Sequence, residues 1–229
     1  MLKVKAFVFN PIQENTYLLY NERGKCIIID PGCYYPEENG VLQAYISKSG
    51  LQCQLLLNTH CHLDHVFGNK YVAEKYGLKL HIHVKEKQML DLAPASGLLY
   101  NLPFDNYAGE IDYIPDSGKI YFDEEELEIL FTPGHSPGHL SFYNQKAGFV
   151  ISGDALFYRS IGRTDLPGGD FDTLIQSIRN KLFALPDETI VYSGHGPQYH
   201  RPLRTETHRE SLCRPLLPTH LYQRHGKER

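Results

Sequence analysis

The sequence has no tryptophan, only two methionines and no long apolar run. A membrane-spanning helix needs roughly 20 consecutive apolar residues, and no window of this chain approaches that length. The opening stretch, MLKVKAFVFNPIQENTYLLY, also lacks the charged start and continuous apolar segment of a secretory signal. We therefore expect no membrane partner and a cytoplasmic location.

Cysteine pairs with metal-type spacing are absent as well. The five cysteines are an odd number, which suits a reducing compartment better than a disulfide framework. Cys61 needs separate consideration because it lies between His60 and His62. Alternate residues of an extended segment point to opposite sides, so we expect the Cys61 side chain to face away from any ligand that the two histidines share.

Charge is distributed unevenly along the chain. The formal net charge is −4, but residues 201–229 contain 7 basic and 3 acidic residues, which leaves 16 basic and 24 acidic residues in the first 200. An acidic main part argues against nonspecific nucleic-acid binding, which depends on a positive field, but it argues neither for nor against a small anionic substrate. We predict a catalytic domain over 1–198 and an atypical, poorly ordered basic tail over 199–229. The oligomeric state stays open.

Short apolar runs separated by turn-forming residues indicate strands in both halves of the chain. Helices are predicted over 37–48, 69–76, 85–91 and 172–184, with Gly77 ending the second and Asp172 starting the last. Two groups of strands with helices between them predict an α/β layered domain with two sheets. The predicted strands are 2–9, 15–20, 26–30, 52–57, 79–83, 120–122, 127–132, 140–143, 149–152 and 189–192.

The densest group of metal-type side chains follows the predicted strand 52–57. His60, His62, Asp64 and His65 fall within six residues. Neutral imidazoles and carboxylates are the ligands expected for zinc, iron or manganese. A loop leaving the end of a strand can turn all four side chains inward, so we predict a metal-binding loop here rather than a solvated polar loop.

Three further candidates each follow a predicted strand through a turn that contains glycine. His135 lies in TPGHSPGH, Asp154 in SGDALF and His195 in SGHGP. Taken singly, each is better explained as a loop or core residue. Glycine lets the backbone turn tightly and approach a ligand, so the repetition of strand, turn and metal-type side chain indicates one site along an edge of the sheets.

The succession HxHxDH, TPGHSPGH, SGDALF and SGHGP resembles the metallo-β-lactamase superfamily, from Asn10 to Pro197. Within it, the segment SIGRTDLPGGD at 160–170 resembles the short, single-domain glyoxalase II-like hydrolases, which are similar to hydroxyacylglutathione hydrolase. The resemblance implies a four-layer αββα sandwich of two mixed sheets with helices outside. It also implies two metal ions, usually zinc with iron or manganese as alternatives. The implied ligands are His60, His62 and His135 for the first ion, Asp64, His65 and His195 for the second, and Asp154 as the bridge.

Two metals with open coordination positions indicate catalysis rather than a structural role. A metal-bridging hydroxide would be available at neutral pH, so we expect hydrolysis, with Asp64 and Asp154 as the catalytic carboxylates. A thiolate can leave without a proton donor, whereas an amine cannot. No spare acid is evident beside the ligands except His139 or Asp165, which favours a thioester over an amide. The resemblance carries more weight, and it implies an acyl-thiol substrate such as S-lactoylglutathione.

Other functions on the same scaffold stay open. They are a persulfide dioxygenase with a single iron, a lactone or phosphodiester hydrolase, and a non-catalytic metal-binding module. For Asp30 and His139, two roles stay equally open, which are support of a ligating side chain and ordinary turn or loop packing. Structural roles are expected for His81 and His83. Arg163 and Asp165 either shape the mouth of the substrate site or, as we favour, pair with each other to stiffen their loop.

Overall fold

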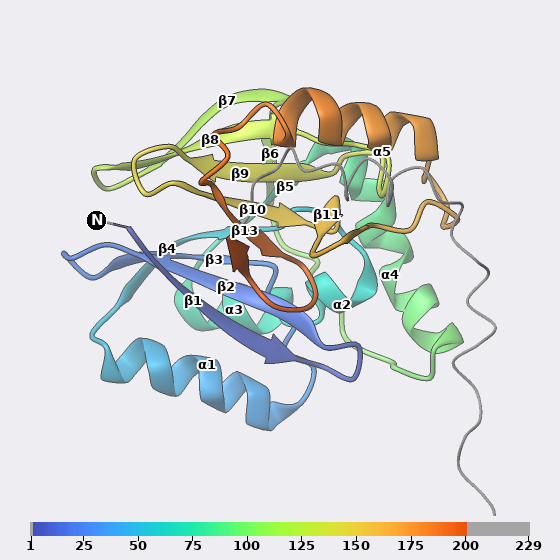
Figure 1. The fold of residues 1–229 in the computed structure, drawn as a ribbon. Coiled ribbons are helices and arrows are strands. Elements are labelled where there is room, and N and C mark those ends of the chain that lie inside the picture. The colour runs from blue at the N-terminus through green and yellow to red at the C-terminus, as the bar shows by residue number, and fades with distance from the viewer. Residues whose placement is uncertain (1, 201–229) are drawn as a thin grey trace, which may run out of the picture.

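The computed structural model describes residues 2–200, with the backbone alone at His200. Two six-stranded sheets lie face to face, and helices cover their outer surfaces (Figure 1). The predicted four-layer αββα sandwich is confirmed. The predicted tail lies outside the described residues, apart from Tyr199 and His200, which add a short strand to one sheet. Within residues 2–200, no helix has both the length and the apolar character needed to cross a bilayer.

The first sheet has the strands in sequence order, antiparallel through the first three and parallel thereafter. Parallel neighbours need crossover connections, which are the helices α1 (Pro36–Lys48), α3 (Asn69–Tyr76) and α4 (Lys87–Leu99). Gly77 ends α3 in the left-handed conformation, as predicted. The strands are β1 (Lys3–Phe9), β2 (Glu14–Tyr20), β3 (Lys25–Ile29), β4 (Gln52–Leu57), β5 (Leu80–His83) and β6 (Ile111–Ile114).

The second sheet has the order β14-β13-β10-β9-β8-β7, with one parallel pair, β10 and β13. The helix α5 (Phe171–Ser177), continued by a wide turn over Ile178–Leu182, covers its outer face. A small hairpin of β11 (Leu156–Phe157) and β12 (Ser160–Ile161) follows β10. The sheet strands are β7 (Ser117–Phe122), β8 (Glu125–Phe131), β9 (Leu140–Asn144), β10 (Phe149–Gly153), β13 (Ile190–Ser193) and β14 (Tyr199–His200).

The buried apolar side chains divide into three clusters that follow the layers. Fully buried Phe142 belongs to the cluster between the two sheets. Leu42 represents the cluster between the first sheet and its helices, and Leu174 the cluster between the second sheet and α5. The loops at one edge of the sandwich are therefore fixed by packed layers on both sides.

Three expectations for local structure need correction. The helix predicted over 85–91 is a short 3₁₀ turn over Val84–Glu86 followed by α4, which runs on to Leu99. The last helix begins at Phe171, where the side chain of Asp170, and not Asp172, accepts the hydrogen bond from the Thr173 N–H at 2.8 Å. The strand β6 was not predicted because only Ile114 of its four residues is fully buried, so it lacks a clear pattern.

Pro94 lies inside α4, where a proline removes one backbone hydrogen bond. The acceptor that loses its partner is the Leu90 carbonyl, four residues earlier. The side chain of Asn106 donates to this carbonyl at 2.7 Å from the loop after the helix. A long-range side-chain contact therefore lets the helix continue through a residue that normally ends it.

Replacing Asn106 by alanine should leave the Leu90 carbonyl without a donor and lower the free energy of unfolding by about 1–2 kcal/mol. In a Pro94→Ala background, the new backbone N–H can serve the same carbonyl, so Asn106→Ala should cost less there. Chemical unfolding of the four proteins of this double-mutant cycle measures the coupling. Strictly additive effects would contradict the proposed compensation.

Candidate metal centre

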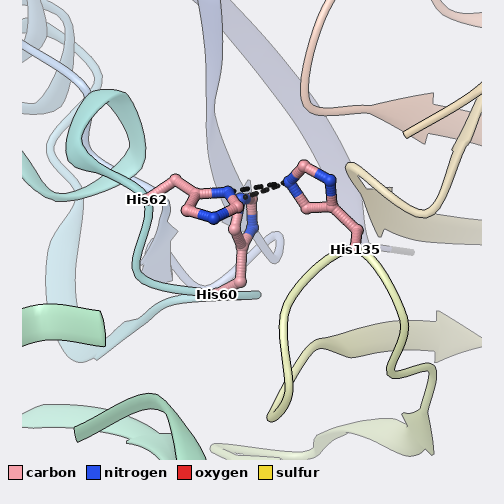
Figure 2. A group of neighbouring side chains, drawn as sticks. All are labelled: His60, His62 and His135. Atoms are coloured by element: carbon pink, nitrogen blue, oxygen red, sulfur yellow. Dashed lines mark hydrogen bonds between the residues drawn. The ribbon is translucent and has the colours of Figure 1, made fainter. Parts of the chain in front are cut away.

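Three imidazoles from the segments that follow β4 and β8 converge on one point (Figure 2). His62 Nδ1 lies 2.8 Å from His135 Nε2, and His135 Nε2 lies 3.2 Å from His60 Nε2. A tetrahedral zinc ion with nitrogens at about 2.0–2.1 Å would hold them about 3.3 Å apart. The three nitrogens are thus spaced as ligands of one ion would be.

Hydrogen bonds on the far side of two rings fix their tautomers. The Thr59 hydroxyl lies 2.7 Å from Asp30 Oδ2, to which it can only donate, so it accepts from His60 Nδ1 at 3.0 Å. His135 Nδ1 donates to the Arg163 carbonyl at 2.7 Å. In the neutral rings, the Nε2 atoms of His60 and His135 therefore carry lone pairs that face each other, an arrangement that a cation between them would stabilise.

A second group lies beside the first. His195 Nε2 is 3.1 Å from Asp64 Oδ2, and His65 Nε2 is 3.7 Å from the same oxygen. His195 Nδ1 faces the Gln13 carbonyl at 3.1 Å, which directs its other nitrogen inward. These three side chains again place three donor atoms close enough to share an ion.

Asp154 lies between the two groups. Its Oδ1 is 3.4 Å from His65 Nε2, and its Oδ2 is 3.5 Å from His135 Nε2 and 3.6 Å from His195 Nε2. All seven side chains singled out in the sequence therefore meet at one place. Gly194 allows this approach, because a Cβ there would lie 2.0 Å from Asp154 Oδ1.

The expectation that a loop carries all four residues of the 60–65 cluster is wrong in part. His60 and His62 lie in the extended segment after β4, whereas Asp64 and His65 lie on the short helix α2 (Leu63–Val66). The helical turn places these two side chains in the second group with His195, although the ring of His65 still lies 4.1 Å from that of His60, centroid to centroid. A change of backbone conformation thus divides one dense motif between two groups.

Orphaned polar atoms support an ion at this place. His65 Nε2 and Asp154 Oδ1 are buried without a hydrogen-bond partner among the described residues, and so is His62 Nε2. Buried polar groups are normally satisfied, so unpaired atoms need an explanation. For His65 and Asp154, a shared cation supplies one, and the imidazole and carboxylate donors are of the type that divalent metals take.

Asp30 supports the candidate ligands through hydrogen bonds. It accepts hydrogen bonds from the Thr59 N–H at 2.7 Å and from the Thr59 hydroxyl, and its Oδ2 is 3.1 Å from His65 Nδ1. Its geometry with His60 and His65 would also satisfy a ligand triad. Because both its oxygens already accept hydrogen bonds, we assign it to orienting His65 rather than to holding an ion.

His139 also supports the site. Its Nε2 accepts the hydrogen bond from the Asp154 N–H at 3.1 Å, and its Nδ1 lies 2.9 Å from the Thr132 hydroxyl. The ring is completely buried, and burial lowers its pKa well below the usual value. His139 therefore stays neutral and positions the backbone of Asp154.

Protonation differs between the two groups. Burial lowers the pKa of His62 to about 3 and that of His60 well below its usual value, helped by the neighbouring imidazoles. Burial also lowers the pKa of His65, but the nearby carboxylates, Asp154 first, outweigh it and raise that pKa. For Asp154, the imidazoles of His65 and His195 outweigh burial and hold the pKa below its usual range. The first group is thus neutral and the second is charge-compensated.

Sequence reasoning missed Glu86, a buried carboxylate that joins two ligand segments. It accepts hydrogen bonds from the Cys61 N–H at 2.8 Å, from the Gly138 N–H at 2.7 Å and from the Ser136 hydroxyl. Cys61 lies between His60 and His62, and Ser136 follows His135. No local pattern marks Glu86, because its partners lie 25 to 52 residues away in sequence.

The remaining candidates lie outside the two groups. The Cys61 side chain packs in the core between the first sheet and its helices, as expected for a residue that faces away. Arg163 and Asp165 form the expected pair, with two contacts of 2.7 Å. His81 contacts backbone carbonyls, and His83 Nε2 lies 2.8 Å from Asp116.

A cavity of about 570 Å³ opens directly onto the cluster. Its floor is formed by five of the seven converging side chains, and its walls by α4, the β11–β12 hairpin and the loop after β12. The floor residues are His62, Asp64, His135, Asp154 and His195.

Comparison with known proteins gives a family match to the Metallo-beta-lactamase superfamily over residues 9–195. The chain is 40% identical over 198 residues to the "Probable metallo-hydrolase YqgX" of Bacillus subtilis, covering 86% of this chain and 92% of that protein. It is 33% identical over 197 residues to the hydroxyacylglutathione hydrolase GloC of Haemophilus influenzae, covering 85% and 91%.

Solved structures of the same fold superimpose on the chain as well. The B3 metallo-beta-lactamase BLEG-1 superimposes with a TM-score of 0.80 at 36% identity, covering 86% of this chain and 94% of that one. A di-iron-bound form of TTHA1623 superimposes with a TM-score of 0.78 at 34% identity and the same coverage.

Glu86→Ala should leave three buried donors unpaired and lower the free energy of unfolding by about 3 kcal/mol or more. Glu86→Gln keeps one acceptor oxygen for one of the two segments, so its free energy of unfolding should fall less than that of Glu86→Ala. Denaturant unfolding measures both, with Glu188→Ala at an exposed position as the matched control. Equal stability of Glu86→Ala and the control would contradict the joining role.

Metal-free protein should lose stability on acidification partly through His62. Its pKa of about 3 in the folded state lies below the unfolded value of about 6.5, so the unfolded chain binds more protons between these values. The contribution of neutral His62 to the free energy of unfolding is complete above pH 6.5 and is therefore lost as the pH falls towards 3. In chelator-treated protein, His62→Gln should flatten the dependence of unfolding free energy on pH between pH 6 and 4, by up to about 1.4 kcal/mol per pH unit. An unchanged slope would contradict a neutral, half-buried His62.

Proposed function

The chain belongs to the metallo-β-lactamase superfamily, and from this premise we propose that it is a dinuclear metal-dependent hydrolase of thioesters. The observation that carries the proposal is the convergence of two ligand groups around Asp154, whose oxygens face both. His60, His62 and His135 would hold one ion, and Asp64, His65 and His195 the other. Zinc is the proposed metal, with iron and manganese as alternatives.

Divalent cations bound here would lower the pKa of coordinated water to about 7 and polarise a substrate carbonyl. The protein's own contribution is positioning. Asp30 orients His65, His139 holds the backbone of Asp154, and Glu86 ties together the segments that carry His60 and His135. The carboxylates of Asp64 and Asp154, both buried, would be the catalytic groups that orient the attacking water.

The leaving group favours a thioester over an amide. An amine needs a proton to leave, whereas a thiolate, with a thiol pKa of about 8.5, does not. The two side chains considered as proton donors are both engaged: His139 with Thr132 and the Asp154 N–H, and Asp165 with Arg163. Neither of them lines the cavity.

The relatives support hydrolysis in general, and one of them supports thioesters. YqgX is named a probable metallo-hydrolase, and GloC is named a hydroxyacylglutathione hydrolase. S-lactoylglutathione is therefore the first thioester to assay. BLEG-1 is described as a B3 metallo-beta-lactamase, so a β-lactam belongs in the same assay as the amide counterpart.

Metal-quantified protein should contain two zinc ions per chain and hydrolyse thioesters. Asp154→Asn should lower kcat/KM by more than about 100-fold, beyond the 10–100-fold typical of residues that only support a ligand. Asp172→Asn, at an exposed position on α5, should leave kcat/KM within twofold and serves as the matched control.

Three results would overturn the proposal. Full activity in Asp154→Asn would remove the bridging role. A single iron per chain with oxygen-dependent turnover of a persulfide would favour the dioxygenase alternative. Faster hydrolysis of the β-lactam than of any thioester would contradict the argument from the leaving group.

A further inference from the structure

The walls of the cavity differ in character from its floor. Above the metal-type side chains, α4 contributes Met89, Leu92 and Ala93, and the opposite wall contributes Phe157 and Ile161 from the β11–β12 hairpin. Several of these apolar side chains are open to solvent, with 44% of Leu92 exposed. Exposed apolar surface that lines a concave site is the usual mark of a binding pocket rather than of packing. Further apolar wall residues are Ile12, Leu166 and Pro167.

The walls offer no free positive charge among the described residues. Among the lysines and arginines of residues 2–200, Arg163 alone lines the cavity, and Asp165 pairs with it through Nε and Nη2. Glutathione carries two carboxylates at neutral pH, and proteins bind such groups with lysine or with arginine in a bidentate contact. A wall whose single guanidinium is already paired with a carboxylate is poorly suited to that carrier.

We infer that the cavity binds an apolar acyl chain and that the preferred substrate is a medium-chain acyl thioester on a carrier without carboxylates. This inference rests on the thioester hydrolysis proposed above and narrows its substrate class. The cavity volume of about 570 Å³ falls within the 300–1,000 Å³ typical of sites for organic ligands. The carbonyl would lie over the cluster and the chain between α4 and the hairpin.

Hydrolysis of N-acetylcysteamine thioesters from acetyl to octanoyl tests the chain-length preference, because this carrier is uncharged. Each methylene that enters the pocket should raise kcat/KM about fourfold, the equivalent of about 0.8 kcal/mol. Glutathione thioesters of the same acyl groups should be turned over no faster. A tenfold preference for S-lactoylglutathione over the hexanoyl and octanoyl N-acetylcysteamine thioesters would overturn the inference.

Binding of non-hydrolysable thioethers separates this inference from the proposed reaction. By calorimetry, S-octyl-N-acetylcysteamine should bind at least 30-fold more tightly than the S-butyl compound. Such binding without turnover of any thioester would overturn the proposed reaction and keep the apolar pocket. Turnover with no dependence of binding on chain length would overturn the pocket and keep the reaction.

Variants at the walls complete the test. Leu92→Asp should lower the octanoyl-to-acetyl ratio of kcat/KM, and the S-octyl-to-S-butyl affinity ratio, at least tenfold. Leu99→Asp places the same charge on α4 at a residue that is 86% exposed and outside the cavity, so both ratios should stay unchanged. Asp165→Asn should free Arg163 and raise the preference for the glutathione carrier at least threefold. Equal ratios in Leu92→Asp and Leu99→Asp would refute the assignment of the wall.

Discussion

Neutral imidazoles whose lone pairs face one another repel, and the site depends on a fold that holds them together nevertheless. His60 and His135 present Nε2 to the same point because Thr59 and the Arg163 carbonyl take the protons on the other side of each ring. The rings cannot relax outward, since both are almost completely buried. A cation between the two nitrogens would turn this repulsion into attraction. The fold therefore holds the two rings in an arrangement that favours cation binding.

The two ligand groups tolerate burial in different electrostatic ways, although they belong to one cluster. The first is a set of neutral rings whose pKa values are lowered by burial, as for His62. The second mixes His65 and His195 with two carboxylates, and the opposite charges offset the cost of burial. Asp154 faces both groups, as a carboxylate shared by the two proposed ions would.

Support for the cluster comes from carboxylates and a histidine that the packed layers hold in place. Glu86 enters from the turn before α4 and fixes two loops at once, and the same helix then forms one wall of the cavity. Asn106 allows α4 to continue past Pro94 and so extends that wall. The first half of α4 therefore lies beside both the ligand segments and the cavity, because Glu86 immediately precedes the helix and Met89, Leu92 and Ala93 line the wall.

The sequence by itself determined the layered fold and the seven candidate side chains, because strand patterns, the dense motif at 60–65 and the repeated strand and glycine turn before the other three are local signals. It also indicated that Cys61 faces away and that Arg163 pairs with Asp165. Only the tertiary structure decided that α2 sends Asp64 and His65 to a different group from His60, and that Asp30 and His139 are supports. Glu86 and the apolar wall were likewise beyond local pattern, since a buried hydrogen bond or a cavity is made by segments that are distant in sequence. Composition and motif spacing do not show which distant segments come into contact, so these features became visible only in the folded chain.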